Sequence, residues 1–447
     1  MQLVVINISL LITTLSYSQN TISINEYTIA VILQDTALSI DASLSIENCK
    51  QQSYMLFNSD ISDYVLRTND NNFNYIHKND TLFINSSIDS VRLNIAYNIP
   101  WDRDTCLIVE DELQRIRKSD EFQVFFERYY RWYPLLYDNF SNYKLSVTTN
   151  SSFGVFAYTS ADSIISSGNR KTYFYNFYDE DIPFLISKLD VFNYKTIKYK
   201  GTNFNFYFLE NTKRLLEVKN NKPIFTVDSI KVDSINNHIY NRCIRITQWY
   251  QNNLKQKEIK NIDFIESTSP HMGGFGLNNL IYLNTQMINY DLYYKYQISH
   301  EIGHIWLGLN TKYKEVGRNF MSESINEYVN LLLYEDFFGK QEFDKLLKKE
   351  FISSSSHFSC SLKEVLNIRK NFNLNNQEQV NIDVLIYKKG PLFLNEFRNK
   401  IGKEIFLKII NDTYTQEKKL ITLSDFESNI KKHNCWKAYL ELFELKL

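Results

Sequence analysis

The spacing of apolar residues changes once along the chain, and this change constrains the fold more than any other feature. Between about residues 20 and 210 the dominant period is two, most clearly in residues 38–46 and 91–99. Such alternation is typical of strands with one buried face. Shorter runs follow at residues 143–149, 154–159 and 204–209. Many strands separated by turns predict a β-sandwich or a related all-β domain.

After about residue 215 the apolar residues follow the helical period instead. This pattern begins in residues 227–253, gives way to strand-like sequence in residues 261–284 and resumes at residue 290. We therefore predict an α+β multidomain fold. An all-β, sandwich-like domain would occupy residues 19–215, and a mainly helical domain would occupy residues 216–447.

Two helix ends can be predicted in the second domain. Residues 320–338 are apolar at helical spacing, and Gly339 follows where a left-handed C-terminal cap would lie. Near the end of the chain, Ser424 and Glu427 have the spacing of a capping box, in which each residue satisfies a backbone N–H of the other. This pair predicts the start of another helix at Ser424.

Length and charge exclude some classes of protein. A chain of 447 residues exceeds one ordinary hydrophobic core, which favours two or three domains. Lys and Arg total 50 against 51 for Asp and Glu, so net charge provides no general attraction to nucleic acid or anionic lipid. We expect no nucleic-acid partner. The aromatic share of 15%, with only 12 Gly and 6 Pro, is typical of a folded chain rather than a disordered one.

The first 18 residues resemble an export signal. An apolar stretch ends in Ser16 and Ser18, small residues at the −3 and −1 positions of a cleavage site. An uncleaved anchor or an N-terminal strand is the alternative, but the apolar run is shorter than the ~20 residues that a spanning helix needs. We expect an exported protein, periplasmic or secreted, that is not inserted in a membrane once the signal is removed.

The five cysteines are widely spaced and include no Cys-x-x-Cys pair. This spacing is not typical of a structural zinc site or of a dense disulfide framework. One or two disulfides remain possible after export, and the odd number leaves at least one thiol unpaired unless two chains are linked. We expect most of the cysteines to be small buried apolar residues.

The pentapeptide HEIGH (residues 300–304) lies in a segment predicted to be helical. Residues four apart share one face of a helix, so His300 and His304 can bind one metal ion. Glu301 lies beside them, where a carboxylate can take a proton from a water that the metal activates. Zinc suits two imidazoles and a carboxylate, because it binds such ligands tetrahedrally and leaves a position open for water. The alternative is two hydrogen-bonded histidines on a polar helix face.

Glu323 is the candidate for the third ligand. It follows His304 after 18 intervening residues, on the next predicted helix, which can return antiparallel and offer its carboxylate to the same ion. An exposed glutamate is the alternative for Glu323 taken alone, but the histidine pair upstream favours a ligand. The sequence therefore predicts one zinc ion held by His300, His304 and Glu323.

This ligand pattern resembles that of the aminopeptidase-N-type zinc peptidases, part of the thermolysin-like gluzincins. The segment SESINEY (residues 322–328) is similar to the NEGFAxY that surrounds the family's third ligand, and YKKG (residues 387–390) is similar to its YxKG. The resemblance implies that Tyr387 donates its hydroxyl to the oxyanion of the reaction, where a phenol would stabilise the developing charge. A ring packed in the core is the alternative for Tyr387.

The resemblance also bears on Glu327. This residue lies four positions after Glu323 on the same predicted helix face, where some thermolysin-like enzymes keep an Asp bonded to the first ligand histidine. A carboxylate there would orient the imidazole of His300 and raise its basicity. A solvated helix residue is an equal alternative.

The segment HMGGFGL (residues 271–277) lies where the family carries GAMEN, a strand that lines the substrate cleft. Gly273 and Gly274 align with its small residues, and the absence of side chains would let a peptide lie against them as an added β-strand. Gly276 takes the place of the glutamate with which the family captures the free amino group of its substrate. The resemblance thus implies a peptide or polypeptide substrate and leaves strict aminopeptidase specificity open.

The resemblance covers most of the chain. WYP (residues 132–134) is similar to the family's N-terminal β-domain, and the second domain to its thermolysin-like catalytic domain. Many members continue with a large helical domain that covers the cleft, whereas this sequence ends soon after Tyr387. We predict a zinc metallopeptidase of aminopeptidase-N type. The alternatives are an endopeptidase of the same fold and a non-catalytic, metal-stabilised binding or accessory protein, which would need neither Glu301 nor Tyr387.

Overall fold

In the computed structural model, residues 22–447 are described except for 35–36, 50–52, 59–60, 62, 101–116, 120–122, 127–130, 137–138, 158, 180–181, 211–213, 220–221, 227–228, 255–258, 268–273, 278, 285–296, 309–311, 314–315, 369–380 and 415–419. The predicted export signal lies outside the described residues. The chain forms two compact units. The first comprises Met1–Ile116, Phe126–Ser151 and Ala161–Pro183, and the second comprises Arg117–Phe125, Ser152–Ser160 and Phe184–Leu447.

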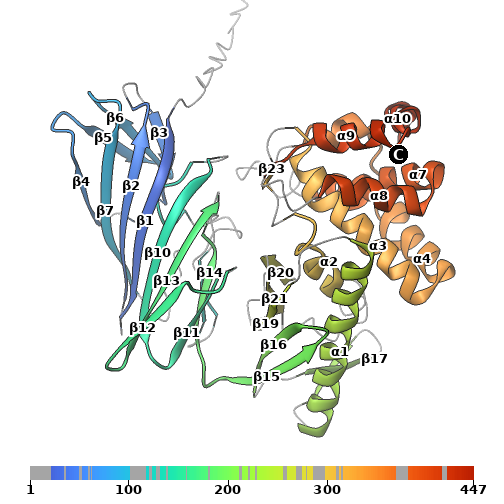
Figure 1. The fold of residues 1–447 in the computed structure, drawn as a ribbon, viewed down its shortest axis with the longest axis horizontal. Helices are drawn as coiled ribbons and strands as arrows, with labels where there is room; N and C mark the ends of the chain where they lie inside the picture. Colours follow the sequence, from blue (N-terminus) through green and yellow to red (C-terminus); the bar gives the residue numbers. More distant parts are fainter. Residues whose placement is uncertain are drawn as a thin grey trace, which may run out of the picture. The chain divides into compact units, whose positions relative to one another are not determined.

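The first unit is built on a seven-stranded sheet in the order β12-β13-β10-β1-β2-β7-β4 (Figure 1). The strands are β1 (Ser23–Leu33), β2 (Ala37–Glu47), β4 (Tyr64–Thr68), β7 (Val91–Pro100), β10 (Ser141–Asn150), β12 (Ser163–Ser167) and β13 (Arg170–Asp179). Neighbours are antiparallel except β1 and β10. A three-stranded sheet joins β3 (Ser53–Leu56), β6 (Thr81–Asn85) and β5 (Asn74–Lys78).

The alternating pattern of the sequence produces this sheet. In β2 every second side chain from Leu38 to Ile46 is buried, and β7 repeats the pattern beside it in antiparallel register. The apolar side chains therefore gather on one face and build the core. The predicted strands at residues 38–46, 91–99 and 143–149 are confirmed as β2, β7 and β10.

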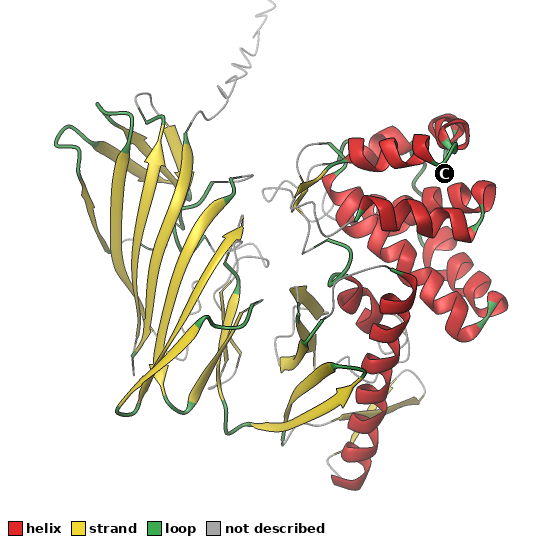
Figure 2. Cartoon of the chain, viewed as in Figure 1, coloured by secondary structure: helices red, strands yellow, loops and turns green. Residues whose placement is uncertain are grey.

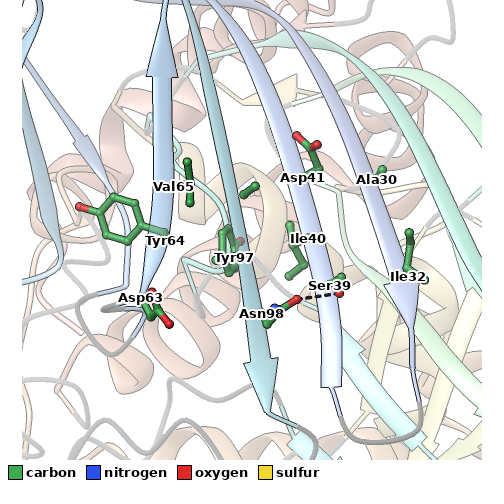
Figure 3. A pocket seen from close by; sticks show the side chains of 11 residues that line it. Ala30, Ile32, Ser39, Ile40, Asp41, Asp63, Tyr64, Val65, Tyr97 and Asn98 are labelled. Atoms are coloured by element: carbon green, nitrogen blue, oxygen red, sulfur yellow. Dashed lines mark hydrogen bonds between the residues drawn. The ribbon is translucent and has the colours of Figure 1, made fainter.

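A hollow of about 460 Å³ lies against strands β1, β2, β4 and β7 (Figure 3). Small or polar side chains contribute to its lining, among them Ala30, Ser39, Ala96 and Asn98. The Ser39 hydroxyl donates a hydrogen bond to Asn98 Oδ1 at 2.6 Å. All its lining residues belong to the first unit, so none of the candidate site residues contributes to this hollow.

The second unit opens with two sheets. A four-stranded sheet joins β11 (Phe153–Ala157), β14 (Phe184–Lys188), β9 (Gln123–Phe126) and β8 (Arg117–Ser119). A five-stranded sheet joins β15 (Phe192–Tyr199), β16 (Thr202–Leu209), β19 (Asn261–Ser267), β21 (Leu280–Asn284) and β20 (Gly274–Leu277), in that order. The hairpin of β17 (Arg214–Lys219) and β18 (Lys222–Thr226) lies in sequence between β16 and β19.

The five-stranded sheet begins upstream of the predicted domain boundary at residue 215. β16 pairs in parallel with β19, and β15 pairs antiparallel with β16, so both strands belong to the second unit. Phenylalanines on one face of the sheet are buried against α1 (Ser229–Asn253), and the Phe206 ring lies 4.4 Å from that of Tyr240. Antiparallel β20 forms the edge of the sheet.

Every helix of the described residues lies in the second unit (Figure 2). After α1 these are α2 (Ile298–Gly303), the π-helical turn η4 (Phe320–Ser324), α3 (Ile325–Phe338), α4 (Lys340–Leu346), η5 (Leu347–Ser353), α5 (Leu362–Leu366), the π-helical turn η6 (Leu385–Lys389), α7 (Gly390–Ile401), α8 (Lys403–Thr413), α9 (Leu423–Lys432), α10 (Trp436–Leu440) and the 3-10 turn η7 (Glu441–Glu444). A short bridge pairs β22 (Lys312–Tyr313) with β23 (Leu420–Ile421). The order of an all-β part followed by a mainly helical part is confirmed.

Two predicted helix ends differ from the structure in detail. Gly339 ends α3 with φ 87° and ψ 165°, a conformation that favours glycine but is not the left-handed helical cap predicted. The capping box of α9 is formed by Thr422 and Asp425, so the prediction of Ser424 and Glu427 was wrong by two residues. Thr422 has the extended backbone that a cap requires, whereas Ser424 already lies inside the helix.

Four of the five cysteines are described, and all four are buried free thiols: Cys49, Cys243, Cys360 and Cys435. Burial raises the pKa of Cys49 and that of Cys360 to about 11. This confirms the prediction of small buried apolar residues for these four. Cys106 lies outside the described residues. No helix in the described part of the chain combines the length and the hydropathy needed to cross a bilayer.

Candidate metal centre and active site

Helix α2 carries the HEIGH segment and is buried between neighbouring elements. It contacts α1, α3 and the edge strand β20. Gly303 has no space for a side chain, because a Cβ there would overlap Asn326 Oδ1 and the hydroxyl of Tyr250. The Asn326 amide in turn donates to the carbonyl oxygen of His300 at 2.9 Å. These contacts fix the position of α2 along its axis, and its rotation about that axis, relative to α1 and α3.

The two histidines turn the same ring nitrogen toward one point. Their Nε2 atoms lie 3.1 Å apart. Each Nδ1 is engaged elsewhere, that of His300 with Glu327 Oε2 at 2.6 Å and that of His304 with the carbonyl oxygen of Leu307 at 3.0 Å. Because both partners only accept, the neutral rings carry their protons on Nδ1 and leave the Nε2 lone pairs free. This is the tautomer that a metal ligand requires.

Glu323 completes a triangle of donor atoms. It lies on the π-helical turn η4, and its Oε2 is 3.5 Å from Nε2 of His300 and 3.6 Å from Nε2 of His304. Tetrahedral zinc with bonds of about 2.1 Å separates its ligand atoms by roughly 3.4 Å. The triangle of 3.1, 3.5 and 3.6 Å therefore fits the donor set and size of a zinc site. Among the described residues, these three are the only such group that could hold a metal ion.

The structure decides between the two alternatives for Glu327. The residue is buried on α3 and contacts His300, so it is not a solvated helix residue. Burial disfavours a charged His300, but the carboxylates of Glu327, Glu323 and Glu301 outweigh it and raise the pKa of His300 well above its ordinary value. The cluster thus attracts positive charge, which either a proton or a metal cation can supply.

Both carboxylate oxygens of Glu301 are held by donors. The side-chain amide of Gln297 donates to Oε1 at 2.9 Å, and the backbone N–H of Gly276 donates to Oε2 at 3.0 Å. Gln297 lies one helical turn before Glu301, and Gly276 lies on β20. The carboxylate is therefore oriented from two sides by neutral donors. Sequence reasoning missed both donors.

Tyr387 lies on the π-helical turn η6 and is half-buried. Its ring centroid is 6.2 Å from that of His300. Burial, followed by the nearby carboxylates of Glu323, Asp383 and Glu301, raises the pKa of Tyr387 well above its ordinary value. The phenol therefore stays protonated near neutral pH and can act as a hydrogen-bond donor beside the histidine pair.

The glycine segment is only partly described. Gly273 lies outside the described residues. Gly274 opens the edge strand β20 and pairs with Leu283 of β21, so the predicted strand is present at this position. At Gly276 a Cβ would overlap the backbone carbonyl oxygen of Glu301, because β20 passes directly against α2. The position that the resemblance aligned with a glutamate therefore has no room for a side chain.

The structure can be compared with known proteins. No protein-family model matches the chain, and no curated protein matches it. Among solved structures, the M1 zinc metallopeptidase from Deinococcus radiodurans matches with a TM-score of 0.58 and 11% identity over 94% of this chain and 92% of that chain. A mutant of that metallopeptidase matches with a TM-score of 0.59, and the same mutant bound to a Tyr-Ser-Ala substrate with 0.58, both at 11% identity over 94% of this chain and 93% of theirs.

The fold is that of the M1 zinc metallopeptidases. The match extends over nearly the whole of both chains, and it includes the sheets that precede the helices. In this chain the second unit brings together His300, His304, Glu323, Glu301 and Tyr387, although a long segment of sequence separates the first from the last. At 11% identity the likeness concerns the fold alone. The chemistry must be argued from the residues.

Proposed function

We propose that the chain is a zinc-dependent peptidase in which His300, His304 and Glu323 bind one zinc ion. The observation that carries this proposal is the triangle of donor atoms with both Nδ1 atoms already bonded to acceptors. Two histidines that served packing alone would not be expected to direct their Nε2 atoms toward one position. The M1 fold of the chain supports the same proposal.

Bound at this triangle, zinc would supply Lewis-acid polarisation of a carbonyl and would make a water more acidic. In the proposed reaction Glu301 takes the proton of the attacking water and later gives it to the leaving amine. Gly276 and Gln297 hold its carboxylate in place. The Tyr387 hydroxyl donates to the carbonyl oxygen as negative charge develops there. Its raised pKa favours the protonated form that this role requires.

Metal analysis combined with digestion of a peptide library tests the proposal. We expect one equivalent of zinc per chain and cleavage that stops when a chelator removes the metal. Zinc binding without any cleavage would instead favour a non-catalytic, metal-stabilised binding or accessory protein. Absence of bound zinc would contradict the proposal at its first step.

A second candidate is an endopeptidase of the same fold, and Gly276 favours it. No side chain fits at this position, so β20 presents no carboxylate there to bind the free amino group of a substrate. Peptides with free and with acetylated N-termini separate the two functions. Equal cleavage of both forms would favour internal cleavage, and release of single N-terminal residues from free peptides alone would favour an aminopeptidase.

Two further expectations belong to the proposal. Gly273 and Gly274 would bind the backbone of the peptide substrate as an added strand on the edge strand β20. The protein would act after export, periplasmic or secreted, following removal of residues 1–18. Expression of the full chain with mass analysis of its mature N-terminus tests the export step.

A further inference from the structure

Ser324 directly follows Glu323 and is fully buried. It is the last residue of the π-helical turn η4. Its hydroxyl donates a hydrogen bond of 2.6 Å to the backbone carbonyl oxygen of Ile386, a residue 62 positions away in the sequence. Ile386 immediately precedes Tyr387. A single side chain therefore connects the backbone beside a candidate metal ligand to the backbone beside the candidate oxyanion donor.

The neighbouring segment is shaped to receive this hydroxyl. Gly390 follows the turn η6, and a Cβ on it would overlap both Oγ and Cβ of Ser324. The absence of a side chain at Gly390 thus lets η4 and η6 approach closely enough for the bond to form. Ser324 also departs from the NEGFAxY motif that its segment resembles, which has glycine at this position and no hydroxyl to donate.

Both connected turns are π-helical. In such a turn a backbone carbonyl oxygen accepts from the N–H five residues later. For Ile386 that residue is Pro391, which has no N–H, so the π-helical pattern supplies no donor to the Ile386 carbonyl oxygen. The Ile386 carbonyl oxygen has a buried partner in Ser324, and this hydrogen bond is one of the contacts that hold η6 against η4. Glu323 lies on η4 and Tyr387 on η6, so the packing of the two turns affects the distance between these side chains.

We propose that Ser324 is a positioning residue, whose hydrogen bond to Ile386 places the Tyr387 hydroxyl relative to the ion held by Glu323. This inference rests on the proposed function, in which Tyr387 donates to the oxyanion. Misplacing a catalytic group by a fraction of an ångström lowers the rate of the chemical step more than it weakens binding of substrate. The effect should therefore appear in kcat rather than in KM.

A double-mutant cycle with Tyr387→Phe tests the proposal. We expect Ser324→Ala to lower kcat by about tenfold while leaving KM nearly unchanged. In the Tyr387→Phe background the same substitution should have almost no effect on kcat, because the hydroxyl that it positions is already gone. An equal loss of kcat in both backgrounds would show that Ser324 serves stability alone and would overturn the proposal.

Ser299 provides a matched control. Like Ser324 it is fully buried and adjacent in sequence to a candidate metal ligand, here His300, but it donates its hydroxyl to Asn330 Oδ1 rather than to η6. Ser299→Ala should change kcat by the same factor with and without Tyr387→Phe. If Ser324→Ala yields no folded protein, Ser324→Cys keeps a weaker donor of similar size and should show a smaller loss with the same dependence on Tyr387.

A crystal structure of zinc-loaded Ser324→Ala separates failure of this inference from failure of the proposed function. We expect Tyr387 to be displaced or disordered while Glu323 keeps its position. An unchanged Tyr387 would overturn the inference whether or not the protein has activity. Absence of peptide hydrolysis by the unmodified chain would overturn the proposed function, and displacement of Tyr387 in the variant would still support the positioning role of Ser324.

Discussion

Each of the two units gathers polar side chains around carboxylate charge, one carboxylate in the first unit and three in the second, and the two clusters are completed in different ways. In the first unit Asp70 accepts four hydrogen bonds, from the backbone N–H groups of Asn72 and Ser87 and from the hydroxyls of Ser86 and Ser87. All distances lie between 2.7 and 2.9 Å. Four donors of the protein therefore bind this carboxylate, and no cation is needed to hold it. We call Asp70 with Asn72, Ser86 and Ser87 the closed cluster.

The cluster in the second unit consists of His300, His304, Glu301, Glu323 and Glu327, and we call it the open cluster because its carboxylates favour a cation. Glu323, Glu327 and Glu301 surround two imidazoles, and the pKa of His300 is raised because these carboxylates favour a positive charge. Burying such groups is unfavourable unless a cation compensates them. The contrast teaches that a carboxylate surrounded by neutral donors serves the fold, whereas carboxylates grouped around two imidazoles indicate a site that favours a cation. Four predictions test this difference.

The largest expected effect is on catalysis. Glu301→Gln keeps the size of the side chain and removes the proton acceptor, so kcat should fall by about 10²- to 10⁴-fold, the usual contribution of a general base. Zinc content should stay at the level of the unmodified protein, because Glu301 is not one of the three proposed ligands. Parallel measurements of turnover and of bound zinc check this expectation. Turnover that is unchanged in this variant would contradict the mechanism.

Asp70→Asn is the matched substitution in the closed cluster. It also replaces a buried carboxylate by an amide, but in the first unit. The variant should keep its kcat and its zinc at temperatures where it is folded. A large loss of turnover in this variant would break the contrast between the clusters.

The second prediction concerns the metal as a source of stability. A ligand that binds only the folded state stabilises it by about 4 kcal/mol when its free concentration is a thousand times its Kd. Zinc should therefore raise the thermal midpoint of the metal-free protein, and the rise should disappear in His304→Ala. Scanning calorimetry with and without a chelator measures it. An equal response to zinc in His304→Ala would place the metal elsewhere.

The third prediction concerns Glu327. Glu327→Gln replaces the carboxylate beside Nδ1 of His300 by a neutral amide, which accepts a hydrogen bond more weakly and can also present a donor. The ring is then less firmly held in one tautomer, and zinc binding should weaken by about 10- to 100-fold. Competition with a chromophoric chelator measures this affinity. Glu335→Gln is the control on the same helix, since Glu335 pairs with Arg398 at 2.5 Å and lies away from the histidines. Equal losses in both variants would indicate a general effect of α3.

The candidate ligands could be predicted from the sequence because their relation is local and periodic. His300 and His304 are one turn apart, and Glu323 lies on the next helical segment at a spacing that also carried the resemblance. The alternation of apolar residues likewise predicted β2 and β7, since a single strand displays its own buried face.

The remaining parts of the site depend on contacts between distant segments. The sequence left Glu327 undecided, because position on a helix face does not reveal whether that face is buried. The bond from Gly276 to Glu301 involves a backbone N–H, which every residue except proline carries, so the sequence holds no signal for it. Gln297 lies one helical turn before Glu301, and that spacing was a usable signal. The contact of Ser324 with Ile386 depends on packing of two turns.

The smallest expected effect is the pH dependence of the stability that Asp70 contributes to the fold. The hydrogen bonds from Asn72, Ser86 and Ser87 lower the pKa of Asp70 to about 2. A folded-state pKa below the ordinary value of about 3.9 means that the carboxylate stabilises the fold above pH 4 and that this contribution is lost as the pH falls through about 2. The difference in thermal midpoint between the unmodified protein and Asp70→Asn, both free of metal, should therefore be constant from pH 7 to about 5 and narrow steadily toward pH 2. A difference that stays constant over the whole range would show that the charge of Asp70 does not contribute, and the contrast with the open cluster would then rest on the metal alone.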